Sequence, residues 1–226
     1  MKRTLIVGLG GIGGYLAEPL ARYLDSSGLC RELVLADGDV YTASNNDRQS
    51  MRLEELGVNK AIAHAKRLSR SFPRISIRSC PEYVSERSID GLVVEESVIF
   101  LCVDNHATRK LFSDHCRRLD DVLLISAGND LTDGNVQVYW KVNGIQRTAP
   151  LDKHHDEIRF PTDRNPAELT CEELASLPGG GQIIFTNLTA ASLALNAFYA
   201  AMTSKLSYGE VYFDVLTGRS NALVRR

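Results

Sequence analysis

The sequence predicts an α/β protein with a Rossmann-like, doubly wound parallel sheet, which antiparallel C-terminal strands extend. Two observations predict this class. Over residues 1–130, short apolar segments alternate with helical patterns, as in parallel βαβ units. After Gly128, a strand-like segment alternates polar and apolar residues, which is typical of an antiparallel strand with one solvated face.

Five segments have the continuous β-branched and leucine content of buried strands. In chain order they are TLIVG, ELVLAD, RISIRS, SVIFLCVD and DVLLISAG. Three segments between them have helical spacing: GIGGYLAEPLARYL, GVNKAIAHAKRL and HATRKLFSDHCRRL. In the first, Pro19 should bend the helix. The apolar residues that share a face in the first two helices are Ile12, Leu16, Leu20 and Leu24, then Val58, Ala61, Ile62, Ala65 and Leu68.

The second half begins with GNVQVYWKVN, the strand with a solvated face. Residues 145–170 are polar and contain proline, which favours a long crossover or lid loop. QIIFTNLTAASLALNAFYAAMTSKL predicts a long buried helix, and EVYFDVLTGRSNALVRR predicts a hairpin turning at Thr217 and Gly218. We therefore expect a single domain, 1–226, with a nucleotide-binding half (1–130) and a second half (131–226) of crossover loop, long helix and hairpin.

Composition excludes several classes of protein. The net charge of −2 and pI near 6.2 provide no basic field for nucleic acid. Because the first predicted strand starts at Thr4, we expect no signal peptide, and we expect no membrane segment because the apolar stretches fall short of ~20 residues. The five cysteines, which include no C-x-x-C pair, indicate reduced thiols and a cytoplasmic protein.

A glycine motif, G-x-G-G-x-G, lies between the first strand and the first helix. Gly8, Gly10, Gly11 and Gly13 permit a tight turn and let phosphates approach backbone N–H groups at the helix N-terminus. The motif predicts a nucleotide site. By itself it does not distinguish NAD from ATP.

Two acids follow the second strand, in ADGD. Asp37 is placed to hold ribose hydroxyls, whereas a second carboxylate at Asp39 would repel a pyrophosphate unless a cation intervened. This pair favours a metal–triphosphate complex. Arg48 and Lys60 could then neutralise a polyphosphate and stabilise charge at phosphorus, although each alone would be typical of a surface cation.

A third acid, Asp104, follows the fourth strand and precedes Asn105. Ligands bind at the carboxyl ends of parallel strands, so Asp104 could hold Mg²⁺ against phosphates. The alternative is that Asp104 caps the following helix.

Together these motifs resemble the ThiF/MoeB-type adenylyltransferases, the family that includes the adenylation domain of ubiquitin-activating enzymes. The matching residues span 4–130 and are Gly8 to Gly13, Asp37-Gly38-Asp39, Asn45 to Gln49 (N-x-x-R-Q), Lys60, and Asp104-Asn105 with Arg109. The resemblance implies ATP-dependent adenylation of the C-terminal carboxylate of a ubiquitin-like or sulfur-carrier protein with a Gly-ending tail. It also implies a homodimer or heterodimer and leaves room for a downstream conjugating protein.

The resemblance also implies roles for individual residues. The cofactor-binding set carried over with the motifs is Gly8, Gly10, Gly11, Gly13, Asp37, Asp39, Ser44, Asn45, Arg48, Gln49, Lys60, Asp104 and Asn105. Of these, Arg48, Lys60 and Asp104 would be catalytic, with Asp104 the Mg²⁺ residue. Asp39 would either touch the metal or orient Arg48.

The sequence departs from the family in two respects. Many members carry two C-x-x-C zinc pairs; none is present here, so no structural zinc is expected. Members often supply a catalytic arginine from a helix before the first strand, where this sequence offers Lys2 and Arg3.

Cys171 is the residue that thioester-forming members would use as a nucleophile. Thr170 is a plausible N-cap, and a helix N-terminus lowers a thiol pKa, whereas Glu172 and Glu173 oppose that effect. A structural role for Cys171 is the alternative. Nearby, Gly179-Gly180-Gly181 should cap a short helix, and Gln182 and Thr186 could face substrate.

Other interpretations remain open. KHHDE (153–157) is more typical of a solvated loop than of a metal site. The whole chain could be an NAD(P)-dependent oxidoreductase, a catalytically silent ThiF-like partner subunit, or a small-substrate or tRNA-base adenylating relative. The paired acids with Arg48 and Lys60 count against the oxidoreductase, and the net charge counts against tRNA.

Overall fold

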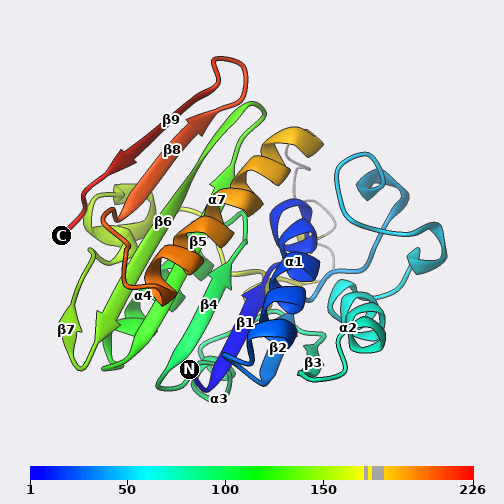
Figure 1. Cartoon of the computed structure of the whole chain (residues 1–226). Coiled ribbons are helices and arrows are strands. Elements are labelled where there is room, and N and C mark those ends of the chain that lie inside the picture. Colours follow the sequence, from blue (N-terminus) through cyan, green and yellow to red (C-terminus); the bar gives the residue numbers. More distant parts are fainter. Residues whose placement is uncertain (171–172, 175–180) are drawn as a thin grey trace.

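The computed structural model describes residues 1–170, 173–174 and 181–226, and their strands form one mixed sheet (Figure 1). The strands are β1 (Arg3–Val7), β2 (Glu32–Ala36), β3 (Ser76–Cys80), β4 (Ser97–Leu101), β5 (Val122–Asn129), β6 (Asp133–Val142), β7 (Ile145–Gln146), β8 (Glu210–Asp214) and β9 (Arg219–Leu223). Their order is β3-β2-β1-β4-β5-β6-β8-β9, with β7 paired to β6. Pairing is parallel from β3 to β5 and antiparallel beyond β5, which confirms the predicted fold class.

Helices cover both faces of this sheet. They are α1 (Gly11–Ser27), α2 (Lys60–Ser71), α3 (Ile89–Leu92), α4 (His106–Arg117), α5 (Asp156–Arg159) and α7 (Ile184–Met202). One hydrophobic core joins α1, α2 and α7 to the sheet, and a second core joins α3, α4 and α5 to the opposite face. Figure 1 shows α1 and α7 side by side across the first face, with α4 behind the sheet. This three-layer arrangement leaves the carboxyl ends of the parallel strands open to a cavity.

Two strands differ from their predicted environments. The RISIRS segment was expected to be buried, but β3 is the edge strand and most of its residues face solvent. GNVQVYWKVN was expected to have one solvated face, yet Val136, Gln137, Val138 and Tyr139 are all buried. The reason is that α7 covers one face of β6, and the segment containing Leu151 and Ile158 covers the other.

Helix α2 presents a different face from the one predicted, and the long helix α7 is buried on one side only. In α2, Ile62 is 43% exposed, and Lys60 and His64 lie on the buried side with Ala61, Ala65 and Leu68. In α7, a row of alanines packs on α1 and the sheet, while Phe185 and Tyr199 remain exposed.

Helix α7 is also longer than expected, since the apolar stretches of the sequence were predicted to fall short of the ~20 residues that span a membrane. Its 19 residues and mean hydropathy of 1.2 would allow it to span a membrane by length and composition. It packs through its small residues against α1, β5 and β6, as a core helix does.

Residues 145–170 are folded against the sheet rather than forming an open lid loop. The segment contains β7, α5 and short 3-10 helices at Leu151–Lys153 and Pro166–Glu168. Leu151 and Ile158 are buried in the second core, and the backbone N–H of Ala149 donates to Arg225. The predicted C-terminal hairpin is confirmed: β8 and β9 pair, and Gly218 adopts a φ of 64° at the turn.

Candidate active site

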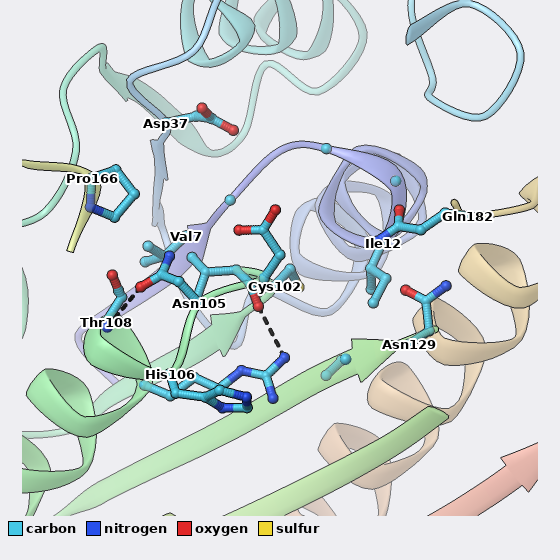
Figure 2. A pocket seen from close by; sticks show the side chains of 18 of the residues that line it. Val7, Ile12, Asp37, Cys102, Asn105, His106, Thr108, Asn129, Pro166 and Gln182 are labelled. Atoms are coloured by element: carbon cyan, nitrogen blue, oxygen red, sulfur yellow. Dashed lines mark hydrogen bonds between the residues drawn. The ribbon is translucent and has the colours of Figure 1, made fainter. Parts of the chain in front are cut away.

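A cavity of about 860 Å³ lies at the carboxyl ends of β1, β2, β4 and β5 and extends beneath β6 and β8. Its volume falls within the range of ~300–1,000 Å³ that small-molecule sites occupy. Figure 2 shows Asp37, Asn105 and Gln182 around this one space, although they come from distant parts of the sequence.

The glycine loop forms one wall of the cavity. Gly8 has a φ of 83°, and a Cβ there would come within 2.6 Å of the Cys102 carbonyl oxygen, so no other residue fits. A Cβ on Gly13 would overlap the Gly8 carbonyl. Position 13 therefore requires glycine because α1 packs closely on the end of β1. Gly8, Gly10 and Gly11 line the cavity; Gly13 does not.

Asp37 follows β2, is only 7% exposed, and lines the cavity. Its carboxylate accepts hydrogen bonds from the backbone N–H groups of Leu9 (2.5 Å) and Asp39 (2.8 Å). Burial raises the pKa of Asp37 from 3.8 to about 6, and the Asp39 carboxylate adds to this shift, while Lys60 and the two N–H groups oppose it. The side chain is therefore a buried carboxyl group at the glycine-loop end of the cavity.

Asp39 is tied to Lys60. Lys60 is only 5% exposed, and its ammonium group lies 2.9 Å from the Asp39 carboxylate, which also accepts a hydrogen bond from the Tyr83 hydroxyl. The Tyr83 ring packs over Gly38, where a Cβ would lie within 2.5 Å of the ring. Of the two alternatives for Asp39, the structure does not support the orientation of Arg48, because Arg48 pairs with Asp47 and with the Ser44 carbonyl, whereas Asp39 pairs with Lys60. A metal contact by Asp39 stays a prediction.

Arg48 and Gln49 lie on the loop after β2. The Asn45 side chain closes a capping box with Thr42, which starts a short 3-10 helix at Ala43–Asn45. Arg48 pairs with Asp47 and with the Ser44 carbonyl, and the Asn187 side chain donates to the Arg48 carbonyl. Asn45, Arg48 and Gln49 line the cavity, and the Gln49 Oε1 is buried without a hydrogen-bond partner among the described residues.

Ser44, the remaining predicted contact on this loop, does not line the cavity. Its side chain is exposed, and its hydroxyl pairs with the hydroxyl of Thr42 at 2.9 Å. The structure therefore does not bring Ser44 together with the other predicted site residues.

Asp104 and Asn105 have different positions after β4. Asn105 is the N-cap of α4, since its side chain accepts from the N–H of Thr108 at 2.8 Å (Figure 2). The alternative that Asp104 caps this helix is therefore wrong. Asp104 is exposed and lines the cavity, while the next two N–H groups of α4 donate to Asp163 of the crossover segment.

This donor set fits a nucleotide with Mg²⁺. Gly8, Gly10 and Gly11 of the glycine loop line the space where phosphates would lie, together with two cations, Arg48 and Lys60. Mg²⁺ is usually held by one or two carboxylates plus phosphates, so the carboxylate of Asp104 suffices. Among the described residues, no group of three or more His, Cys, Asp or Glu could hold a metal ion.

The other predicted residues have mixed outcomes. Cys171, Glu172 and Gly179-Gly180 lie outside the described residues. Gln182 lines the cavity, whereas Thr186 is buried and donates to the Leu131 carbonyl. Arg3 pairs with Glu32 at the opposite end of β1, and Lys2 pairs with Glu96.

Two further residues, His155 and Cys102, line the cavity. His155 of KHHDE was expected to be solvated, but it is buried between Glu157 and Glu210, each 2.8 Å away. Burial raises the pKa of the Cys102 thiol to about 12, which opposes thiolate formation.

Sequence reasoning gave no site role to Tyr83, Asn187 or Arg109. Tyr83 and Asn187 contact motif residues 44 and 139 positions away, and no local pattern signals such contacts. Arg109 was part of the matched motif, and the structure places it in the cavity wall, 8% exposed, donating to the Val103 carbonyl at 3.0 Å.

Comparisons with known proteins show the family and the fold of this chain. The model of the ThiF family matches residues 1–211. The adenylyltransferase and sulfurtransferase MOCS3 of Drosophila ananassae is 35% identical over 142 residues, which are 62% of this chain and 30% of that protein. The molybdopterin-synthase adenylyltransferase of Escherichia coli K12 is 29% identical over 144 residues, which are 63% of this chain and 55% of that protein.

The same fold occurs in solved structures. MccB of E. coli with ATP superposes with a TM-score of 0.73 at 18% identity, covering 99% of this chain and 64% of that one. At this identity the likeness concerns the fold alone. The chain spans less than two thirds of the length of these relatives. Because the family model matches nearly its whole length, the chain belongs to the ThiF family.

Proposed function

We propose that this protein uses ATP to adenylate a C-terminal carboxylate, on a ubiquitin-like or sulfur-carrier protein or on a peptide. The observation that carries the proposal is the buried Lys60, held by Asp39 at the glycine-loop end of the cavity that Asp37, Arg48 and Asp104 also line. The ThiF-family match and the relatives named adenylyltransferases support the same reaction.

In this reaction an oxygen of the substrate carboxylate bonds to the α-phosphorus, and the bond from that phosphorus to pyrophosphate breaks. Asp37 would accept hydrogen bonds from the ribose hydroxyls, and glycine N–H groups would bind phosphate oxygens. Lys60 and Arg48 would offset negative charge that grows on phosphorus. Asp104 would hold Mg²⁺, which supplies further neutralisation of the phosphates when bound.

A role in binding phosphate explains why Lys60 is buried despite the unfavourable free energy of burying a charge. A buried ammonium is unfavourable without a partner, and Asp39 supplies one that is half exposed. The pair leaves the ammonium at the cavity wall, where it can interact with a phosphate. An NAD-dependent oxidoreductase has no need for this arrangement, which favours adenylation.

The experiment is ATP–pyrophosphate exchange by the full chain, with a sulfur-carrier protein, a ubiquitin-like protein and a short peptide, each ending in a free carboxylate. We expect exchange that depends on one of these substrates. Lys60→Met should lower its rate by about 100-fold or more, as the loss of a charge-stabilising donor does.

Lys66→Met is the matched control, because Lys66 is an exposed lysine on the same helix and lies outside the cavity. It should keep the wild-type exchange rate. Full exchange by Lys60→Met, or no exchange with any substrate despite bound ATP, would contradict the proposal.

A further inference from the structure

Arg109 is a buried cation in the cavity wall with no assigned role. It lies in the first turn of α4, and its guanidinium reaches the end of β5, where Gly128 leaves the space that a Cβ would fill. Only 8% of the residue is exposed, and it faces the cavity. Gly128 is therefore a glycine because Arg109 occupies the position of its missing side chain.

The guanidinium is left without a full set of partners. Its Nη2 donates to the Val103 carbonyl at 3.0 Å, and its Nε is buried with no partner in the part of the chain that the structure describes. Within residues 1–170, 173–174 and 181–226, no carboxylate oxygen lies within 4.0 Å of it. Burial lowers the pKa of Arg109, and the nearby Asp104 carboxylate partly opposes this. A buried cation is normally paired, so the site favours an anionic group from a ligand.

The order of the strands indicates which anionic group Arg109 would bind. Asp37 follows β2, the glycine loop follows β1, Asp104 follows β4, and Arg109 packs at the end of β5. Lys60 and Arg48 serve the phosphates on the β1–β2 side. Arg109 lies on the β5 side of Asp104, so an anion bound there would be a group other than those phosphates.

Beyond Arg109 the cavity wall is rich in hydrogen-bond acceptors. Asn129 and Gln137 line it, and the side-chain oxygen of each is buried without a partner in the described residues. Such oxygens fit the N–H groups of an extended peptide. The wall therefore combines a site for an anion with acceptors for the chain that leads to it.

We propose that Arg109 binds the terminal carboxylate of the peptide or protein tail, in a subsite separate from the nucleotide phosphates. The subsite rests on the proposed adenylation function and assigns to Arg109 the recognition of the substrate's terminal carboxylate. Asn129 and Gln137 then accept hydrogen bonds from the tail's N–H groups. The same chemistry could instead serve a phosphate of the nucleotide, and the experiment separates these two sources.

The test uses the full chain and a fluorescein-labelled peptide ending in Gly-Gly, as the free acid and as the C-terminal amide, in the presence of a non-hydrolysable ATP analogue. Wild type should bind the acid about tenfold or more tightly than the amide, as charge-assisted hydrogen bonds predict. Arg109→Gln should abolish that preference and leave the Kd for ATP within about twofold, while Arg109→Lys should retain part of it.

Lys110→Gln is the control, since it removes a charge from the same helix outside the cavity and should keep the preference. If Arg109→Gln weakens ATP as much as the acid peptide, the guanidinium belongs to the nucleotide and the proposal is overturned. Equal binding of acid and amide by wild type overturns it as well.

Thermal unfolding provides a second measurement. Removal of an unpaired buried charge should leave the Tm of Arg109→Gln at or above that of wild type. A large fall in Tm would make Arg109 a structural residue and would overturn the proposal. If pyrophosphate exchange occurs but the KM for the carrier protein is the same in Arg109→Gln as in wild type, the carboxylate subsite is overturned and the adenylation function stands. If selective binding of the acid peptide depends on Arg109 but no pyrophosphate exchange occurs, the adenylation function is overturned and the carboxylate subsite stands.

Discussion

Single buried charges define the chemistry of the cavity and also cost stability. Asp37 is only 7% exposed, and its two N–H partners do not compensate fully for the loss of water, since burial raises its pKa from 3.8 to about 6. A carboxyl with a raised pKa holds its proton more tightly in the folded state than in the unfolded state. The stability that Asp37 contributes is therefore greatest below about pH 4 and falls as pH rises through about 6.

Asp37→Asn tests this sign. Relative to wild type, the variant should gain unfolding free energy between pH 4 and pH 7, by up to about 3 kcal/mol for a shift of about two pKa units. Loss of one accepted N–H bond should subtract about 1 kcal/mol at every pH. Urea unfolding across that range measures the difference. A flat difference, or one that falls with pH, would contradict the account.

At the scale of elements, α2 presents three polar residues on one face: Lys60, His64 and Arg67. His64 is fully buried, with one ring nitrogen 2.8 Å from the Tyr41 hydroxyl and the other 3.0 Å from Arg67. Arg67 also pairs with Glu55 and donates to the Ser50 carbonyl. The face therefore holds the loop that carries Arg48, while its first residue reaches the cavity.

This network gives the stability of the protein a pH dependence opposite in sign to the one that Asp37 contributes. Burial, and then Arg67 and Lys60, lower the pKa of His64 from 6.5 to about 3. The unfolded state then binds more protons between these values, so stability is fully present above pH 6.5 and is lost as pH falls toward 3.

His64→Gln should remove that acid loss, which is of order 4 kcal/mol for so large a shift. Denaturant unfolding between pH 7 and pH 4 should show a shallower decline for the variant than for wild type. His154→Gln, which replaces an exposed histidine, should follow the wild-type curve closely. A His64→Gln curve parallel to wild type would show that His64 does not remain neutral in the folded state.

The crossover segment is also held at the level of elements. Asp163 accepts from the first N–H groups of α4, and His155 bridges Glu157 and Glu210. Glu210 is 1% exposed and also pairs with Arg225 near the C-terminus. These contacts explain why a polar, proline-containing segment packs on the sheet instead of forming a loop over the cavity.

At the scale of the whole molecule, local patterns were sufficient for the parallel half and its motifs. Gly8 and Asp37 lie where strand ends and turn chemistry predicted them. The environments that depend on position in the sheet were not predictable: β3 is exposed because it is an edge strand, and β6 is buried on both faces because α7 and the crossover segment cover it.

The site shows the same division. The motif residues could be found from spacing, but their partners could not, because Asn187 and Tyr83 meet the motif only after the chain folds. The face of α2 was mistaken for the same reason, since His64 is buried by contacts with Tyr41 and Arg67 rather than by apolar periodicity.

The central claim is that a carboxylate oxygen of the substrate attacks the α-phosphorus of ATP in this cavity. The most direct measurement is transfer of ¹⁸O from a substrate labelled at its terminal carboxylate, followed by release with hydroxylamine and mass spectrometry of the AMP. We expect AMP that carries one ¹⁸O atom, with a yield that falls in Lys60→Met and not in Lys66→Met. Unlabelled AMP, or formation of ADP and phosphate instead, would contradict it.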